Sequence, residues 1–191
     1  ATVISPNTTL MKETGLTAAE VSEVLGLSAD IDITTFNPYA AGVNAADALA
    51  VEKVSQQIMS TISTFAAATE GSGASAADAF STALASVVEV VQQKSVAFQS
   101  DSTVKLDFSS STDLASIQNN VTTKAATVFG VDQTALATMA NDTATAIKNV
   151  NDKIDTVSDL TSDASKNVFS TTQVLSEQVE TAAKTEAAGG T

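Results

Sequence analysis

The chain of 191 residues contains no cysteine, no histidine and no arginine. Without cysteine it has no disulfide, no thiolate nucleophile and no thiolate metal ligand. Without histidine it lacks the commonest general base and the commonest transition-metal ligand. Without arginine it has no bidentate clamp for phosphate or carboxylate. Together these absences exclude Ser-His-Asp and Cys-His centres and histidine-based zinc sites, and we expect no enzymatic activity.

Aromatic residues are also scarce. They make up 4% of the chain, with no tryptophan, although 43% of the residues are hydrophobic. Alanine, valine, leucine and isoleucine must therefore fill the core, which suits closely packed helices, and the chain is too hydrophobic to be disordered. The length allows one domain with its own core, so we expect residues 1–191 to form a single helical domain.

The charge is strongly one-sided. There are 22 acidic residues against nine basic ones, which gives a net charge of -13. This balance argues against binding nucleic acid and against docking on an anionic membrane, and it fits a calcium-rich exterior. No apolar run approaches the roughly 18 residues of a membrane span, so we expect no membrane insertion.

The two ends suggest a larger protein. No basic and apolar signal peptide opens the chain. Ala1 and the tail 187–191 resemble cuts made inside a longer polypeptide, and we expect this domain to be an excised part of one.

Capping patterns predict short helices within residues 5–38. Ser5 and Pro6 form a helix start that Gly15 ends, and Thr17 with Glu20 forms a capping box whose helix ends at Gly26. The segment 27–36 is predicted to be non-helical. We expect it to lie on the core through its apolar residues Ile31, Ile33 and Phe36, before another helical turn starts at Asn37-Pro38.

Longer helices are predicted within residues 44–186. Starts at Asn44, Ser75, Thr112 and Asp132 are followed by apolar residues three and four apart. The predicted apolar stripes are Val51, Val54, Ile58, Ile62 and Phe65; Phe80, Leu84, Val87, Val88 and Val91; Leu114, Ile117, Val121, Val128 and Phe129; and a set over 136–182 that includes Ile147, Val150, Ile154, Val168, Leu175 and Val179. Gly71-Ser72-Gly73 ends the first helix, and the polar stretch 158–163 is expected to divide the last region into two helices.

One segment has a strand-like period. Val104, Leu106 and Phe108 alternate with polar residues, but no partner strand is evident, which leaves a loop and a short β-ribbon near 103–108 as alternatives. The predicted fold is therefore an all-α bundle of about five to seven helices, with this ribbon as an open question.

Five aspartates are candidate calcium ligands. Asp152, Asp155 and Asp159 lie three and four apart and would share a helix face, whereas Asp30 and Asp32 lie in the early loop. Calcium prefers such oxygens, but no segment has the order of an EF-hand loop. A solvated helix face is the alternative for Asp152, Asp155 and Asp159, and capping of the next turn is the alternative for Asp30 and Asp32. No other cofactor is expected.

The N-terminal third resembles a known type of module. The sequences ATVISPNTTL at 1–10, GLTAAE at 15–20, LGL at 25–27 and DITTFNP at 32–38 resemble helical modules of very large secreted bacterial surface proteins, among them RTX-type and cadherin-like adhesins. The resemblance covers residues 1–60. One departure is Asn7, where leucine is expected, so the first helix should be less buried.

The resemblance implies an extracellular or cell-surface location, β-rich neighbouring domains and no catalytic residues. We expect a non-catalytic structural or interaction module of a secreted adhesin-like protein, with those domains, another protein or a cell surface as partners. One alternative is an extracellular module that binds calcium, a glycan or a peptide through loops 27–38 and 99–112. Another is a filament or signalling coiled coil built on the stripe at 136–182.

Overall fold

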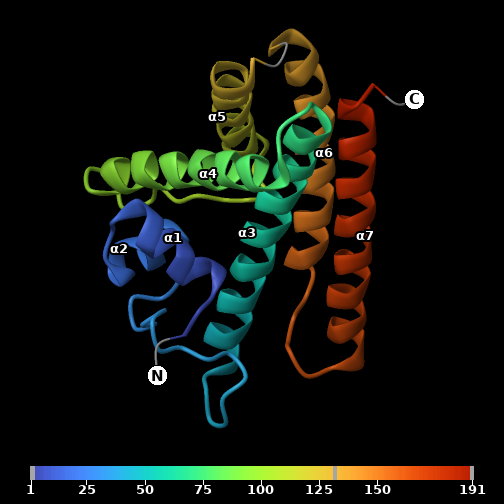
Figure 1. Cartoon of the computed structure of the whole chain (residues 1–191). Helices are drawn as coiled ribbons and strands as arrows, with labels where there is room; N and C mark the ends of the chain where they lie inside the picture. Colours follow the sequence, from blue (N-terminus) through green and yellow to red (C-terminus); the bar gives the residue numbers. More distant parts are fainter. Residues whose placement is uncertain (1–2, 131–132, 190–191) are drawn as a thin grey trace.

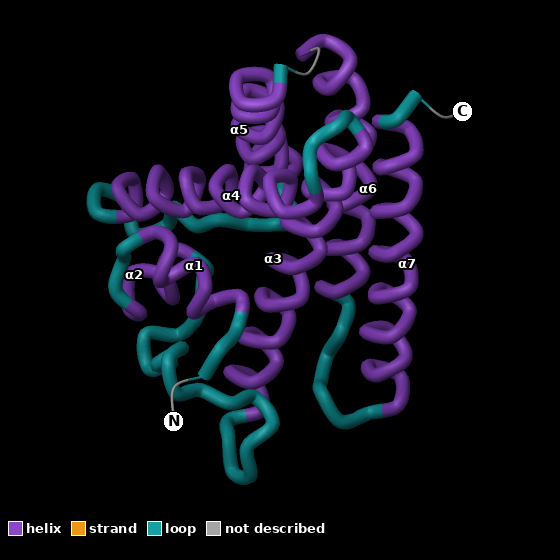
Figure 2. Tube along the Cα trace, in the orientation of Figure 1, coloured by secondary structure: helices purple, strands orange, loops and turns teal. Residues whose placement is uncertain are grey.

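The computed structural model describes residues 3–130 and 133–189, with the backbone alone for 133–140, and this part of the chain is entirely helix and loop (Figure 2). The all-α prediction is confirmed. The seven helices described are α1 (Pro6–Thr14), α2 (Ala18–Val24), α3 (Ala45–Gly71), α4 (Ala76–Phe98), α5 (Ser111–Phe129), α6 (Gln133–Asp155) and α7 (Asp163–Ala187).

The predicted caps set most helix boundaries. Ser5, Thr17, Asn44 and Ser75 each accept a hydrogen bond from the first turn of the helix that follows, and Thr17 and Glu20 complete a capping box. Helix α5 begins one residue earlier than predicted, because Ser110 is its cap. The predicted cap at Asp132 lies outside the described residues.

The predicted division of the last helical region is confirmed. Helix α6 ends at Asp155 and α7 begins at Asp163. Ser162 caps α7 by accepting from the backbone N–H of Ser165 at 3.2 Å. The polar residues between the two helices satisfy the ends of both, so one continuous helix does not form.

Helix α3 is the centre of the molecule. Helices α3, α6 and α7 run side by side, while α4 crosses α3 and rests on α1 and α2 (Figure 1). Helix α3 contacts every other helix except α2, and α5 packs mainly on α4 and α6. The main core forms where these helices meet, and its largest fully buried side chains include Phe65, Phe108 and Ile58.

The middle of α3 is buried on more than one face. Its predicted stripe is confirmed at Val51, Ile58, Ile62 and Phe65, and Val54 is half-buried. Beyond that stripe, the structure also buries polar and small side chains on the other faces of the helix. These are Ala48, Gln57, Ser60, Thr61, Thr64, Ala66, Ala68 and Thr69. A surface helix would expose them. Neighbouring elements satisfy Gln57 and Thr61, and Thr69 donates to the carbonyl oxygen of Phe65 in its own helix.

Two loop predictions need correction. Residues 103–108 form no β-ribbon in the described structure: the N–H of Leu106 donates to the carbonyl oxygen of Val24 at 2.8 Å, and no ladder follows. The alternation arises because Leu106 and Phe108 point into the core from an extended loop. At Asn37-Pro38 the chain makes a hydrogen-bonded turn and no helix, with the N–H of Ala40 donating to the carbonyl oxygen of Asn37.

The burial of α1 and α4 also differs from the prediction. Asn7 is 1% exposed, so it does not make the first helix less buried; its Nδ2 donates to Ser55 Oγ at 3.1 Å, which lets an amide occupy the interface with α3. On α4, Phe80 is exposed, while Ala79, Ala83 and Val90 join Val87 and Val91 inside. Because Ala79 and Ala83 are small, α4 packs on α3 with this face turned inward. Phe80 then lies on the exposed side of α4.

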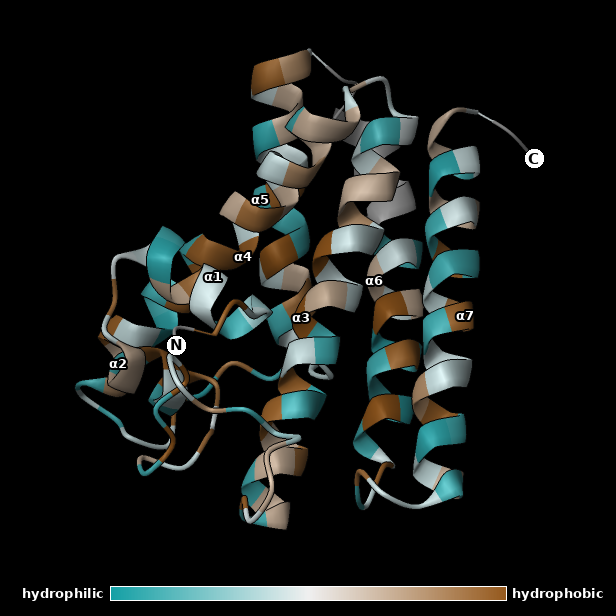
Figure 3. Ribbon diagram, turned by 60° about the horizontal axis from the view of Figure 1, so that its bottom comes forward, coloured by the Kyte–Doolittle hydropathy of each residue, from teal (hydrophilic) through white to brown (hydrophobic). Residues whose placement is uncertain are grey.

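Helix α7 packs through small and polar residues. Only Ser165, Thr172 and Ala183 are fully buried on it, whereas Val168, Leu175 and Val179 are half-buried. Figure 3 shows this helix mostly in the teal and white of polar residues. Ala68 of α3, Ala125 of α5 and Ala183 form a separate small cluster, and Gly71 at the end of α3 lies directly against the backbone of α7.

No helix in the described ranges has the combination of length and hydropathy that a membrane span requires.

We predict that Gly71→Ala destabilises the fold by about 2 kcal/mol. A Cβ at this position would overlap the backbone oxygen of Lys184 and lie 2.8 Å from the Cβ of Ala187, so α7 would have to move away from α3. Urea unfolding measures the change. In an exposed helix the same substitution is stabilising because alanine is the better helix former. A gain in stability would therefore show that the two backbones do not approach at Gly71.

Candidate functional site

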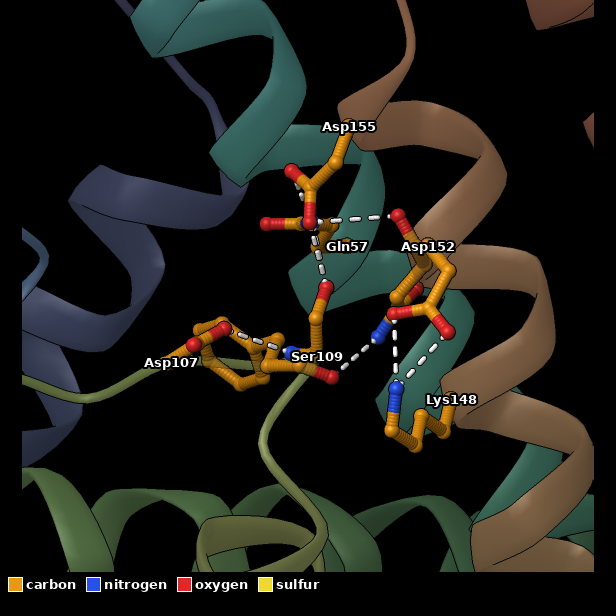
Figure 4. Close-up of polar contacts among 8 residues, drawn as sticks. Gln57, Asp107, Ser109, Lys148, Asp152 and Asp155 are labelled. Atoms are coloured by element: carbon orange, nitrogen blue, oxygen red, sulfur yellow. Dashed lines mark hydrogen bonds and ion pairs between the residues drawn. The ribbon is translucent and has the colours of Figure 1, made fainter.

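Polar side chains gather where α3, α6 and the loop 99–110 meet (Figure 4). The amide nitrogen of the buried Gln57 donates to Asp155 Oδ1 at 2.9 Å and to Ser109 Oγ at 3.2 Å. Ser109 in turn donates its hydroxyl proton to Asp155 Oδ2 at 2.6 Å. The Asp155 carboxylate therefore links the central helix to the loop through both of its oxygens.

The fully buried Asn151 extends this network by one helical turn. Its Nδ2 donates to the carbonyl oxygen of Phe108 at 2.8 Å and to Thr61 Oγ1 at 3.3 Å. On the outer side, Lys53 Nζ donates to the backbone oxygen of Asp155 at 2.8 Å and so satisfies the end of α6.

This network contains a serine beside a carboxylate but no stronger base. Ser109 gives its only proton to Asp155, and that carboxylate also accepts from Gln57. The chain has no histidine that could lie between them and take up the proton. These hydrogen bonds hold the loop 99–110 in place, and that loop carries the buried Leu106 and Phe108.

The structure separates the candidate calcium ligands. Asp152 is exposed and pairs with Lys148 at 2.7 Å, one turn away on α6. Asp155 turns toward Gln57 and Ser109. The prediction that Asp159 shares a face with these two is wrong, because α6 ends at Asp155 and Asp159 belongs to the following loop.

Asp159 and Asp32 act as local turn formers. Asp159 accepts from the backbone N–H groups of Thr161 at 2.7 Å and Ser162 at 2.6 Å. Hydrogen bonds hold the pKa of the Asp159 carboxyl well below its ordinary value. They come from the backbone N–H and hydroxyl of Ser162 and from the same two groups of Thr161. Asp32 accepts from the hydroxyl of Thr34 at 2.6 Å and from its N–H at 2.9 Å, and these bonds lower its pKa.

Asp30 is exposed beside this turn. Across the described ranges, no three carboxylates come together in a group that could hold a metal ion. The alternative interpretation of Asp32, as a cap of the next turn, matches its hydrogen bonds to Thr34. Calcium binding itself stays a prediction.

A hollow that the helix periodicity did not predict lies beside the early loop. We call it the Tyr39 hollow: about 280 Å³ in volume, it is bounded by residues 3–7, by residues of the loop 33–39 and by the first half of α3. Ile33 and Val51 are buried beneath it, while Ile4, Tyr39 and Met59 are exposed around it. The loop 27–38 is a candidate binding site in the sequence, and residues of that loop line the hollow. The helical stripes gave no signal, because the hollow forms only when the loop folds onto α3.

Two further hollows adjoin the Tyr39 hollow. The α7 hollow, of about 420 Å³, lies between α3, α6 and α7 and shares Gln56 and Met59 with it. On the other side, a hollow of about 280 Å³ lies between residues 38–48 and the loop at 159–161, and it shares Pro38 and Tyr39. The three hollows together follow the same side of α3.

The charge around these hollows is negative. Glu52 lines the Tyr39 hollow, and Glu177 and Glu180 line the α7 hollow. Burial and then the nearby Glu52 carboxylate raise the pKa of Tyr39 to about 12, because both disfavour the tyrosinate anion. The Glu52 carboxylate is therefore close enough to act on the Tyr39 hydroxyl.

Compared with protein families, curated proteins and solved structures, the chain matches none. The resemblance of residues 1–60 to adhesin modules therefore stays a prediction, and the function must be argued from this chain's own residues.

We predict that Asn151→Ala lowers the free energy of unfolding by about 2 kcal/mol. The substitution leaves the carbonyl oxygen of Phe108 without its 2.8 Å donor in a buried position. Urea unfolding measures the change in the free energy of unfolding. The control is Asn149→Ala at an exposed position of the same helix, which should change it by less than about 0.5 kcal/mol. Equal effects of the two variants would contradict a structural role for the network.

A second prediction concerns acid. Because the pKa of Asp159 is lower in the folded protein than the roughly 3.9 of an unfolded chain, its contribution to stability is present above that value and is lost as the pH falls. Asp159→Asn should therefore be less stable than the unmodified protein at pH 7, and the difference should shrink steadily below about pH 4. Thermal melts across this range measure the gap. A gap of constant size would refute the role of the charge.

Proposed function

We propose that this chain is a non-catalytic structural or interaction module of a secreted bacterial surface protein of the adhesin type. The observation behind the proposal is that acidic side chains, with hydroxyl side chains as donors, hold turns and loops of the fold in place. Asp32, Asp155 and Asp159 each hold a turn or a loop in place through hydrogen bonds of 2.6 to 2.9 Å. The resemblance of residues 1–60 and the net charge of -13 favour the extracellular setting.

The proposed partners are β-rich domains of the same polypeptide, another protein or a cell surface. A bundle in which α3 contacts five other helices offers a firm spacer between such domains. The ends of the described chain lie at opposite sides of the molecule, which suits insertion in a series (Figure 1).

Surface labelling tests the location. Antibodies raised against the 191-residue chain should label intact cells of the source bacterium, and protease added outside should remove the label. A cytoplasmic protein on the same cells serves as the control and should stay unlabelled and intact. Labelling that requires permeabilised cells would overturn the proposal.

The second candidate function is ligand binding. The Tyr39 hollow, at the loop 27–38, is the observation that favours it, since exposed apolar side chains gathered at a hollow are typical of an interaction site. Calcium is the other ligand proposed for this class. Titration calorimetry with calcium should give no heat and no change in melting temperature if the aspartates serve only as caps.

The filament or coiled-coil alternative has less support. Of the stripe at 136–182, Ile147, Val150 and Ile154 are buried within the chain itself, where α6 packs against α3, α5 and α7. A separate coiled-coil partner would need these same side chains.

A further inference from the structure

We propose that the Tyr39 hollow binds a basic peptide segment, which places an apolar side chain in the hollow and a lysine or arginine at Glu52 and the neighbouring glutamates. The inference rests on the second candidate function, ligand binding. It does not depend on where in the cell, or in which larger protein, the module lies.

The apolar part of the site comes from three exposed side chains. Ile4 is 95% exposed, Tyr39 is 67% exposed and Met59 is 43% exposed, and all three line the Tyr39 hollow. Single exposed apolar residues are ordinary on protein surfaces, but a group of them around a hollow marks an interaction site. The two adjoining hollows share lining residues with it and offer further places for side chains of a peptide.

The charged part of the site selects a cation. Glu52, Glu177 and Glu180 line these hollows, and none of them forms an ion pair with another described residue. No lysine is among the described residues that line the three hollows. In contrast, the larger hollow between α1, α4 and α5, which Glu13 and Glu89 line, also contains Lys124, and Lys124 pairs with Glu89 at 3.0 Å. Charge complementarity therefore assigns the basic partner to the Tyr39 side of α3.

The absence of tryptophan allows a direct binding assay. The probe is the peptide amide Lys-Trp-Lys-Leu-Lys, whose tryptophan emission reports binding when the full 191-residue chain is added. The matched probe is Glu-Trp-Glu-Leu-Glu. We expect the basic probe to bind, the acidic probe not to bind, and the affinity of the basic probe to fall as salt is raised.

Variants locate the site. Tyr39→Ala should weaken binding of the basic probe by about tenfold and Glu52→Gln by about fivefold. Glu186→Gln removes the same charge from an exposed position on α7 outside the three hollows and should change the affinity by less than about twofold. Thermal melts verify that each variant is folded; Tyr39 is exposed and Glu52 half-buried, so both should be.

Three results would overturn the proposal. The first is no binding of the basic probe at millimolar concentration. The second is equal binding of the acidic probe, which would mean that the occupant is not cationic. The third is an equal loss of affinity in Glu52→Gln and Glu186→Gln, which would mean general charge attraction without a site. None of these results bears on surface labelling. The proposed surface location is therefore tested separately, and a failure to bind the peptide does not decide it.

Discussion

The burial of the middle of α3 on several faces is the constraint on which the rest of this structure depends. From Gln57 to Thr69 most side chains of the helix are buried, and they alternate between apolar, small and polar types. Such a helix cannot lie at a surface, and each of its polar groups that is buried without a partner costs free energy. Five helices therefore surround it, and several of their residues serve to satisfy it.

The polar network at Gln57 is the consequence of that burial. Asp155 is a candidate calcium ligand in the sequence. In the structure Asp155, Ser109 and Asn151 instead form hydrogen bonds with α3 and with the loop 99–110 that packs on it. Small residues form the contact between α3 and α7. Ala68, Gly71 and Ala183 allow the two helices to approach closely. Where no partner is available, as at Ser60 Oγ and Thr64 Oγ1, the buried groups stay without hydrogen bonds among the described residues.

The hollows follow from the uneven cover of α3. Along its first half the N-terminal segment and the early loop cover one side and pack less completely than helices do, whereas α6 and α7 run along the other side (Figure 1). Apolar side chains such as Tyr39 and Met59 then stay exposed beside glutamates that have no counter-ion in the described chain. This combination distinguishes that side of the molecule from the face at Glu89 and Lys124, where the charges are paired.

The sequence by itself determined the helices, their capped ends and the break between Asp155 and Asp163, because these depend on residues three or four apart. It also determined the absence of histidine and cysteine chemistry. The tertiary structure alone decided which faces are buried, so Phe80 is exposed and Asn7 is buried against expectation. It likewise turned the strand-like period at 103–108 into a core-facing loop and separated Asp159 from Asp152 and Asp155. The Tyr39 hollow is non-local in the same way, since residues 3–7, the loop 33–39 and α3 meet only through packing, which no short-range pattern encodes.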